Sequence, residues 1–470
     1  IMYLKSIVDS LSNSNLFLEL DTRTKKERIT INCTSRLANS LLISGLSRTR
    51  KSPLVIITPT FEEAGRYLPL LELFGWNKTF VYPSSDYSPY DKYEQSSEIT
   101  WGQLQVISEL IEQEDYSNLC IITTERCLQP HLPPLSYIRN KFLYINKLDS
   151  YNLEDLAKSL SELGYEKDNL VQQEAKWSRR GDIIDIFPVN RDAPIRLEFF
   201  GDKLEKIKEL DPITQRSHES IDRIVISPVS INSLIEDKLN KDLNININES
   251  ESLKNYLSIA WPNKQSLLDY LPSNSFVVIE DQSQCISHCK IWYEKIQEEL
   301  CEEDKSKFGE LTIKPTEIMS NINKYNGINI SSLNNIKNNN LSLDISNRPL
   351  NILPNQFGKL GSSIKEYIKN RDNVFLISAQ PSRAVALLQE HECPSIFLNR
   401  PNKDEVLRIT RERNVPIAFK CNTDAQLAGV YLPSFKIVLI TDKEFFGQQS
   451  LVNNSYIRRR RKSISKSVDP

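Results

Sequence analysis

Apolar runs and helical periodicities alternate along the first 140 residues. The segment SPLVIITPT (52–60) is a continuous apolar run of the kind that a buried strand has, and FEEAGRYLPLLELFG (61–75) follows with helical periodicity and ends at a glycine. KTFVYP (78–83) and NLCIITTERCLQP (118–130) read as further strands, and EITWGQLQVISELIEQE (98–114) reads as a helix between them. This alternation predicts an α/β fold with a mostly parallel sheet.

The pattern changes between residues 141 and 226. The segment NLEDLAKSLSELGY (152–165) is typical of an amphipathic helix that ends at Gly164. The stretch KWSRRGDIIDIFPVNRDAPIRLEFFGDKLEKIKELDPITQRS (176–217) holds two apolar runs separated by a Pro/Asn/Asp segment, which predicts a β-hairpin followed by a third strand. We therefore expect a small α+β insertion in this part of the chain.

The second of these strands, IRLEFF, alternates strictly. Side chains of a strand point to opposite faces in turn, so its six residues divide into two sets. One face takes Ile195, Leu197 and Phe199, and the other takes Arg196, Glu198 and Phe200. A large aromatic side chain therefore lies on the polar face, beside a glycine.

The α/β pattern resumes after residue 227. The segment SLLDYLPSNSFVVIEDQSQC (266–285) predicts a helical turn, a proline break and a buried strand. The Asn-rich stretch NINKYNGINISSLNNIKNNNLSL (321–343) reads as loops or short edge strands. Strand and helix signals return in 346–455, and the last segment, YIRRRRKSISKSVDP (456–470), is basic and has no apolar period, which favours a linker.

Composition narrows the class of protein. A length of 470 residues allows about three or four domains. With 59 basic and 61 acidic side chains the formal charge is −2, which argues against a dedicated nucleic-acid binder. We find no apolar run long enough to span a bilayer and no signal-peptide pattern. Eight scattered cysteines suit reduced thiols, so we expect a cytoplasmic protein without a membrane partner.

The sequence gives little support for a metal site or for catalytic residues. The clusters CISHC (285–289) and HEC (391–393) lack a second ligand pair at a zinc spacing, so we interpret them as ordinary thiols and predict no metal site. None of the four histidines belongs to a Ser/His/Asp or Cys/His signature, so no catalytic residue is predicted. Asp182, Asp185 and Glu198 are read as solvated acids on strand faces.

An α/β unit interrupted by an insertion is typical of a motor-type nucleoside triphosphatase. Such an enzyme holds phosphates with a Gly-rich loop followed by Lys and Ser/Thr, between its first strand and first helix. This chain has ITINCTSRLANSLLISGL (29–46) there, without GK[ST] and without a glycine before Gly45. Glu280 and Asp281 stand where a Mg²⁺-binding acid pair would be. We predict that this chain binds no nucleotide cofactor and hydrolyses no ATP.

The segment around residues 178–217 carries a family resemblance. SRRGDIIDIFP and PIRLEFFGDKLEKIKELDPITQRS closely resemble the domain shared by UvrB and the bacterial transcription-repair coupling factors (Mfd). YPSSDYSPYDKYEQSSEITWGQLQVISEL (82–110) looks like the coupling-factor version of its region, with no room for the long aromatic hairpin by which UvrB probes damaged DNA. SLLDYLPSNSFVVIED resembles the UvrB segment that ends in a Mg²⁺-binding box, in degraded form, and 346–455 looks like the domain that follows in coupling factors.

The resemblance implies an architecture for the whole chain. A UvrB-like motor domain with a degenerate nucleotide site is expected from 1–140 and 227–345, with a docking domain, 141–226, inserted into it. A small α/β domain, 346–455, and a basic linker, 456–470, complete the chain. The family's polymerase-interacting domain, translocase lobes and regulatory domain are not in this sequence, so the chain looks like the N-terminal portion of a coupling factor.

The resemblance also implies a function and a site. In the family the inserted domain docks UvrA, and the key contacts fall by motif on Arg180, Arg196 and Phe200, with Arg180 reaching the face from the neighbouring strand. Arginine and aromatic side chains are the residue types that dominate interface hot spots. The implied role is recruitment of nucleotide excision repair to RNA polymerase stalled at a lesion, by a chain that we expect to be a monomer.

In the whole family protein, an ATP-dependent DNA translocase, the contacts to RNA polymerase, DNA, ATP and Mg²⁺ belong to the missing parts. Two other functions are possible from the residues. A UvrB-like helicase would need a phosphate loop and a damage-probing hairpin, and neither is present. A nucleic-acid-binding module would use the RRRRK run (458–462), which we interpret instead as a solvated linker.

Overall fold

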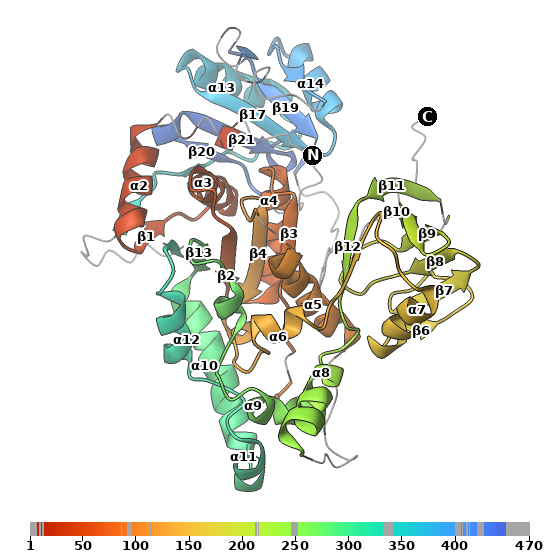
Figure 1. The fold of residues 1–470 in the computed structure, drawn as a ribbon. Coiled ribbons are helices and arrows are strands. Elements are labelled where there is room, and N and C mark those ends of the chain that lie inside the picture. The colour runs from red at the N-terminus through yellow and green to blue at the C-terminus, as the bar shows by residue number, and fades with distance from the viewer. Residues whose placement is uncertain are drawn as a thin grey trace.

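The computed structural model places three parts of the chain side by side, with a central parallel sheet, a β-rich part on the right and a second α/β part at the top (Figure 1). The description covers residues 7–447 except 9–10, 12–13, 86, 92–95, 113–114, 212–213, 215, 246–251, 332–341, 400–405, 407, 410–411, 413 and 421–426. The predicted basic linker, 456–470, lies outside these residues. Within them, no helix is both long and apolar enough to cross a membrane.

The central sheet has seven strands in the order β15-β1-β14-β13-β2-β4-β3, and every neighbouring pair is parallel. The strands come from both sides of the inserted segment, so the insertion interrupts one domain. This confirms the predicted α/β class. The strand bounds are β1 (Ile29–Asn32), β2 (Leu54–Thr58), β3 (Lys78–Val81), β4 (Leu119–Thr124), β13 (Phe276–Glu280), β14 (Gly327–Ser331) and β15 (Ser342–Asp344).

Helices cover both faces of this sheet. In β2, Leu54 and Ile56 join one hydrophobic cluster, whereas Val55 and Ile57 join the other. Burial on both faces is the reason that this strand reads as a continuous apolar run and not as an alternation. The covering helices include α2 (Asn15–Lys26), α3 (Arg36–Thr49), α4 (Phe61–Leu73), α5 (Ser97–Glu112), α10 (Gln282–Glu299) and α12 (Pro315–Ile322).

The prediction for the Asn-rich stretch 321–343 is wrong in part. Its GINIS segment is β14, a central strand that pairs with β1 on one side and β13 on the other. Gly327 begins this strand because a Cβ atom there would lie only 1.7 Å from the carbonyl oxygen of Val277. The glycine therefore marks a close approach between two strands and not a loop.

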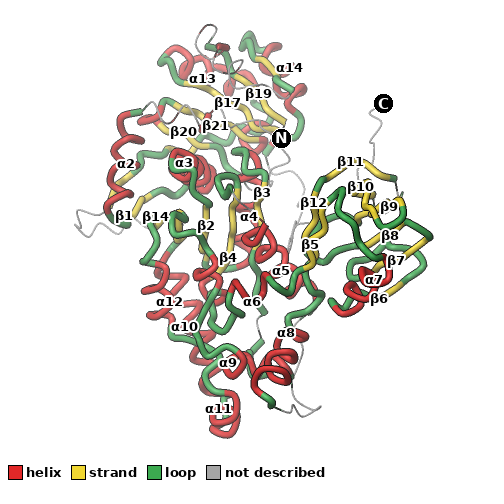
Figure 2. The backbone as a smooth tube through the Cα atoms, in the orientation of Figure 1, coloured by secondary structure: helices red, strands yellow, loops and turns green. Residues whose placement is uncertain are grey.

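The inserted part leaves and rejoins the central domain through an antiparallel pair, β5 (Leu143–Asn146) with β12 (Arg223–Ile226). Figure 2 shows that the rest of this part consists of strands and the helix α7, joined by loops. The strands form a six-stranded sheet in the order β11-β10-β9-β8-β7-β6, longer than the predicted hairpin and third strand. Its members are β6 (Glu166–Lys167), β7 (Lys176–Arg180), β8 (Ile183–Ile186), β9 (Ile195–Phe200), β10 (Lys203–Leu210) and β11 (Ser217–Ile221).

One face of this six-stranded sheet is covered and the other is open. Leu156 and Leu160 of helix α7 (Leu153–Glu162) pack in one cluster with Leu197 and Phe199 of β9. The opposite face, which we call the outer face, carries the alternate side chains of β7 to β10. Most side chains of the outer face are at least partly exposed, as in an antiparallel sheet with one buried face, but Ser178 and Asp185 of this face are buried.

The last part is a six-stranded sheet in the order β16-β20-β21-β17-β19-β18. Its Phe375 and Phe419 belong to the same hydrophobic cluster as Leu37 and Leu41 of α3, so this part shares a core with the central domain. The bounds are β16 (Arg348–Pro349), α13 (Phe357–Lys369), β17 (Asn373–Ser378), α14 (Pro381–Glu390), β18 (Ile396–Phe397), β19 (Ile417–Lys420), β20 (Val430–Leu432), β21 (Ile437–Thr441) and α16 (Asp442–Phe446).

Candidate docking face and the cavity of the parallel sheet

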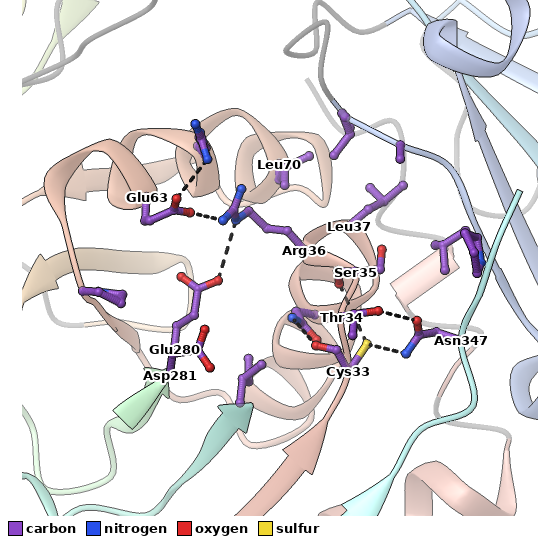
Figure 3. A pocket seen from close by; sticks show the side chains of 18 of the residues that line it. Cys33, Thr34, Ser35, Arg36, Leu37, Glu63, Leu70, Glu280, Asp281 and Asn347 are labelled. Carbon is purple, nitrogen blue, oxygen red and sulfur yellow. Dashed lines mark hydrogen bonds and ion pairs between the residues drawn. The ribbon is translucent and has the colours of Figure 1, made fainter. Parts of the chain in front are cut away.

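A cavity of about 670 Å³ opens at the carboxyl ends of β1 and β13 (Figure 3). This is the place where a motor-type enzyme holds its nucleotide. The connection from β1 to α3 consists only of Cys33, Thr34 and Ser35, and the Ser35 hydroxyl accepts a hydrogen bond from the Ala38 amide at 3.3 Å. The first turn of α3 is thus capped by its own chain.

Charged side chains inside this cavity are paired with one another. The Arg36 guanidinium pairs with Glu63 of α4, and its Nε lies 3.7 Å from Oε1 of Glu280 (Figure 3). The Tyr67 hydroxyl donates to the same Glu280 oxygen at 3.0 Å. Burial raises the pKa of the Glu280 carboxyl, and Arg36 opposes that rise.

This geometry differs from a phosphate cradle in two respects. A connection of three residues is too short to wrap around a phosphate with successive backbone amides. The arginines that line the cavity among the described residues, Arg36 and Arg66, are both bound to carboxylates, Arg66 through Nη1 to Oε1 of Glu63 at 2.9 Å. Their charge is therefore balanced inside the protein.

The outer face of the inserted sheet has a defined register. Ser178, Asp185, Arg196 and Lys208 are cross-strand partners in one row. Arg180, Ile183, Glu198 and Lys206 form the next row. Directly opposite residues of antiparallel strands share a face, so all of these side chains lie on the outer face.

Phe200 and Phe199 lie on opposite sides of β9, as the alternation predicts. Phe200 is 77% exposed, whereas Phe199 is 8% exposed and its ring meets Tyr151 edge-on at 6.5 Å between centroids. Ile183 is a second exposed apolar side chain of the outer face. Single exposed apolar residues are common, but two on the same face beside arginine are typical of a contact surface.

Arg196 pairs with Asp185, an acid predicted to be solvated. Its Nε and Nη2 donate to the two carboxylate oxygens of Asp185 at 2.7 and 2.8 Å. The interpretation of Asp185 as a solvated acid is wrong, because this residue is buried and its carboxylate pairs with Arg196. Glu198 pairs with Lys208 at 2.7 Å, and Asp182 lies in the turn between β7 and β8. The signal for Asp185 was its place opposite Arg196, which only the strand register reveals.

Arg180 lies farther from the other two predicted residues than expected. Strand β8 separates β7 from β9, so Arg180 does not stand on the strand next to Arg196 and Phe200. Its side chain is exposed, and Nη2 donates to the carbonyl oxygen of Asn169 at 2.7 Å. All three residues nevertheless share the outer face.

The cysteine clusters lie in the hydrophobic cores. Cys285 and Cys289 are one helical turn apart on α10, and both are buried against the central sheet. Cys393 is buried in the last part of the chain. The described part of the chain holds no group of three or more His, Cys, Asp or Glu side chains with a geometry for a metal ion.

Known proteins match two parts of this architecture. The family model "UvrB interaction domain" matches residues 143–231, which hold the six-stranded sheet and its outer face. The family model "Cyanobacterial Mfd, Rossmann-like domain" matches residues 349–447. The chain is similar to the N-terminal region of the transcription-repair coupling factors. The two matches cover the inserted part and the last part of the chain, and they confirm the resemblance that the hairpin motif carries.

Relatives agree with this assignment. The transcription-repair-coupling factor of Bacillus subtilis (strain 168) is 25% identical over 281 residues, which are 53% of this chain and 24% of that protein. The factor of Haemophilus influenzae is 28% identical over 191 residues, 41% of this chain and 16% of that protein. The UvrABC system protein B of Colwellia psychrerythraea is 31% identical over 127 residues, 27% of this chain and 18% of that protein. The chain thus spans about a quarter or less of the coupling factors that it matches here.

Proposed function

We propose that the outer face of the inserted sheet binds UvrA, and that the chain thereby recruits nucleotide excision repair to RNA polymerase stalled at damaged DNA. The match to a UvrB interaction domain and the coupling-factor relatives support a role in transcription-coupled repair. In the longer protein, ATP-driven translocation and contacts to RNA polymerase and DNA would fall to other parts.

The exposure of Phe200 carries the proposal. Its ring projects from the open face of a sheet whose other face is a filled core, and burying such a ring in a partner removes a large apolar area from water. Arg196 on the same strand face, and Arg180 two strands away, add the charged contacts that suit an interface centre. Phe200 is not part of the hydrophobic cluster of the inserted sheet, so the described core does not depend on its ring.

Titration of UvrA with the chain in a calorimeter tests the proposal. Phe200→Ala should weaken binding by roughly 1–4 kcal/mol, the range for a central aromatic contact. Ile291→Ala is the matched control, because Ile291 is similarly exposed, at 64%, but lies on α10 of the central domain. Equal affinity of Phe200→Ala and wild type, or an equal loss in Ile291→Ala, would contradict the assignment of the face.

We also propose that this chain binds no Mg-ATP. The three-residue connection after β1 and the ion pairs of Arg36 support this proposal. Calorimetry with Mg-ATP should show no binding heat at micromolar concentrations, which are on the order of the Kd that a phosphate cradle would give. A stoichiometric heat that disappears when a bulky side chain is placed in the cavity, as in Ser35→Trp, would show that the cavity is a nucleotide site.

A further inference from the structure

Asp185 and Arg196 form the best-defined ion pair of the outer face. They are direct cross-strand partners of β8 and β9, and the side of the guanidinium, Nε and Nη2, meets both carboxylate oxygens at 2.7 and 2.8 Å. A bidentate pair of this kind fixes the plane of the guanidinium as well as its position. The described residues provide no hydrogen-bond partner for the remaining terminal nitrogen, Nη1.

The two partners differ in their access to solvent. The Asp185 side chain is 6% exposed, whereas the Arg196 side chain is 25% exposed. A docking protein can therefore reach the arginine and not the carboxylate. Glu198, an acid of the neighbouring row, pairs with Lys208 at 2.7 Å, and the hydrogen bonds of the Arg196 guanidinium go to Asp185.

We propose that Asp185 is a positioning residue of the docking face, which holds Arg196 in the orientation that the partner binds. The proposal rests on the proposed function of this face. Binding usually costs conformational entropy, because a long side chain must be ordered in the interface. A side chain that is already ordered before binding avoids this cost, which corresponds to about 3- to 10-fold in affinity. Asp185 thus contributes to binding through Arg196, without touching the partner.

The pair also changes how Arg196 must be tested. Arg196→Ala would leave the buried carboxylate of Asp185 without its partner, so a loss of binding would be mixed with a loss of stability. Arg196→Gln with Asp185→Asn replaces both charges by neutral amides, an isosteric one in place of Asp185 and a shorter one in place of Arg196. The two single variants complete a double-mutant cycle. UvrA affinity and thermal unfolding are measured for all four chains.

Asp185→Asn should weaken UvrA binding by about 3- to 10-fold in the wild-type chain and by less than about 2-fold in Arg196→Gln. Asp237→Asn is the matched control. Asp237 forms an ion pair with Lys141, at 2.7 Å, and this pair does not belong to the outer face. The Asp237→Asn chain should bind UvrA with the affinity of wild type. An unchanged affinity in Asp185→Asn, or an equal loss in both backgrounds, would overturn the proposal. If neither wild type nor any variant binds UvrA, the proposed function fails instead.

Two further measurements cover the case in which Asp185→Asn does not fold. Arg196→Lys keeps a positive charge beside Asp185 but loses the bidentate fork, and it should weaken UvrA binding to a similar degree. In the free chain, the Nε–H resonance of Arg196 should be sharp and slow to exchange with water. Wild-type affinity in Arg196→Lys, or a fast-exchanging Nε–H in the wild-type chain, would show that the fork does not position the side chain.

Discussion

The central domain and the inserted sheet both place an arginine against a buried acid, and the outcome differs. Arg36 lines a cavity and pairs with two acids, Glu63 and Glu280, and its side chain is 27% exposed. Arg196 lies on the outer face and pairs with one acid, Asp185, and its side chain is 25% exposed. The two arginines are therefore almost equally exposed, and they differ in the number of carboxylates around the guanidinium. Two acids balance the charge of Arg36, whereas Arg196 has one acid and an Nη1 without a hydrogen-bond partner among the described residues.

The comparison also extends to apolar residues. In the central domain the strand side chains of both faces are buried, as β2 shows, whereas β9 buries one face only. Adjacent residues of β9 consequently have opposite roles in the protein. This difference makes it possible to separate stability from binding by changing one residue at a time.

Phe199→Ala should produce the largest effect. Removal of this buried ring from the core of the inserted sheet should cost about 3–5 kcal/mol of unfolding free energy, because the cavity it leaves can relax only in part. Phe200→Ala should change the stability by less than about 0.5 kcal/mol. Thermal and urea unfolding of both variants give the comparison. The reverse result would mean that the strand phase is shifted by one residue.

Glu125→Gln should change the pH dependence of the central domain. Glu125 is buried, neither carboxylate oxygen has a hydrogen-bond partner among the described residues, and burial raises its pKa from 4.5 to about 7. Between these values the folded chain retains a proton that the unfolded chain releases, so stability falls as the pH rises through this window. This pKa shift corresponds to a loss of roughly 3 kcal/mol in unfolding free energy once the pH is above 7.

The amide of Glu125→Gln cannot ionise, so this variant should match wild type near pH 5 and exceed its stability by that amount near pH 8. Urea unfolding at several pH values measures the difference. Glu317→Gln, on the exposed surface of α12, is the control and should follow wild type throughout. A Glu125→Gln chain that loses stability with pH as steeply as wild type would assign the decline to another group.

Arg180→Ala should have the smallest effect. Arg180 lies two strands from β9 and already donates to the Asn169 carbonyl, so its loss should weaken UvrA binding by about 1 kcal/mol, less than the loss of Phe200. Calorimetry of the two variants side by side measures the ranking. An effect of Arg180→Ala larger than that of Phe200→Ala would place the centre of the interface on β7.

Much of this molecule could be predicted from local patterns. Continuous apolar runs marked the parallel strands, and strict alternation in IRLEFF determined which of two neighbouring phenylalanines is buried. Both signals work because burial is decided residue by residue along a strand, so the sequence records it directly. The missing GK[ST] loop could be read in the same way, since a phosphate cradle is built from consecutive residues.

Tertiary structure alone decided which strands are neighbours. The sequence of the GINIS segment is typical of a loop or an edge strand. In the structure it is a central strand, because β1 and β13, from distant parts of the chain, pair with it on either side. The separation of Arg180 from β9, and the pairing of the buried Asp185 with Arg196, likewise depend on the order and register of β7, β8 and β9. Local sequence does not contain this information, because the pairing of strands is set by contacts between segments that lie far apart in the chain.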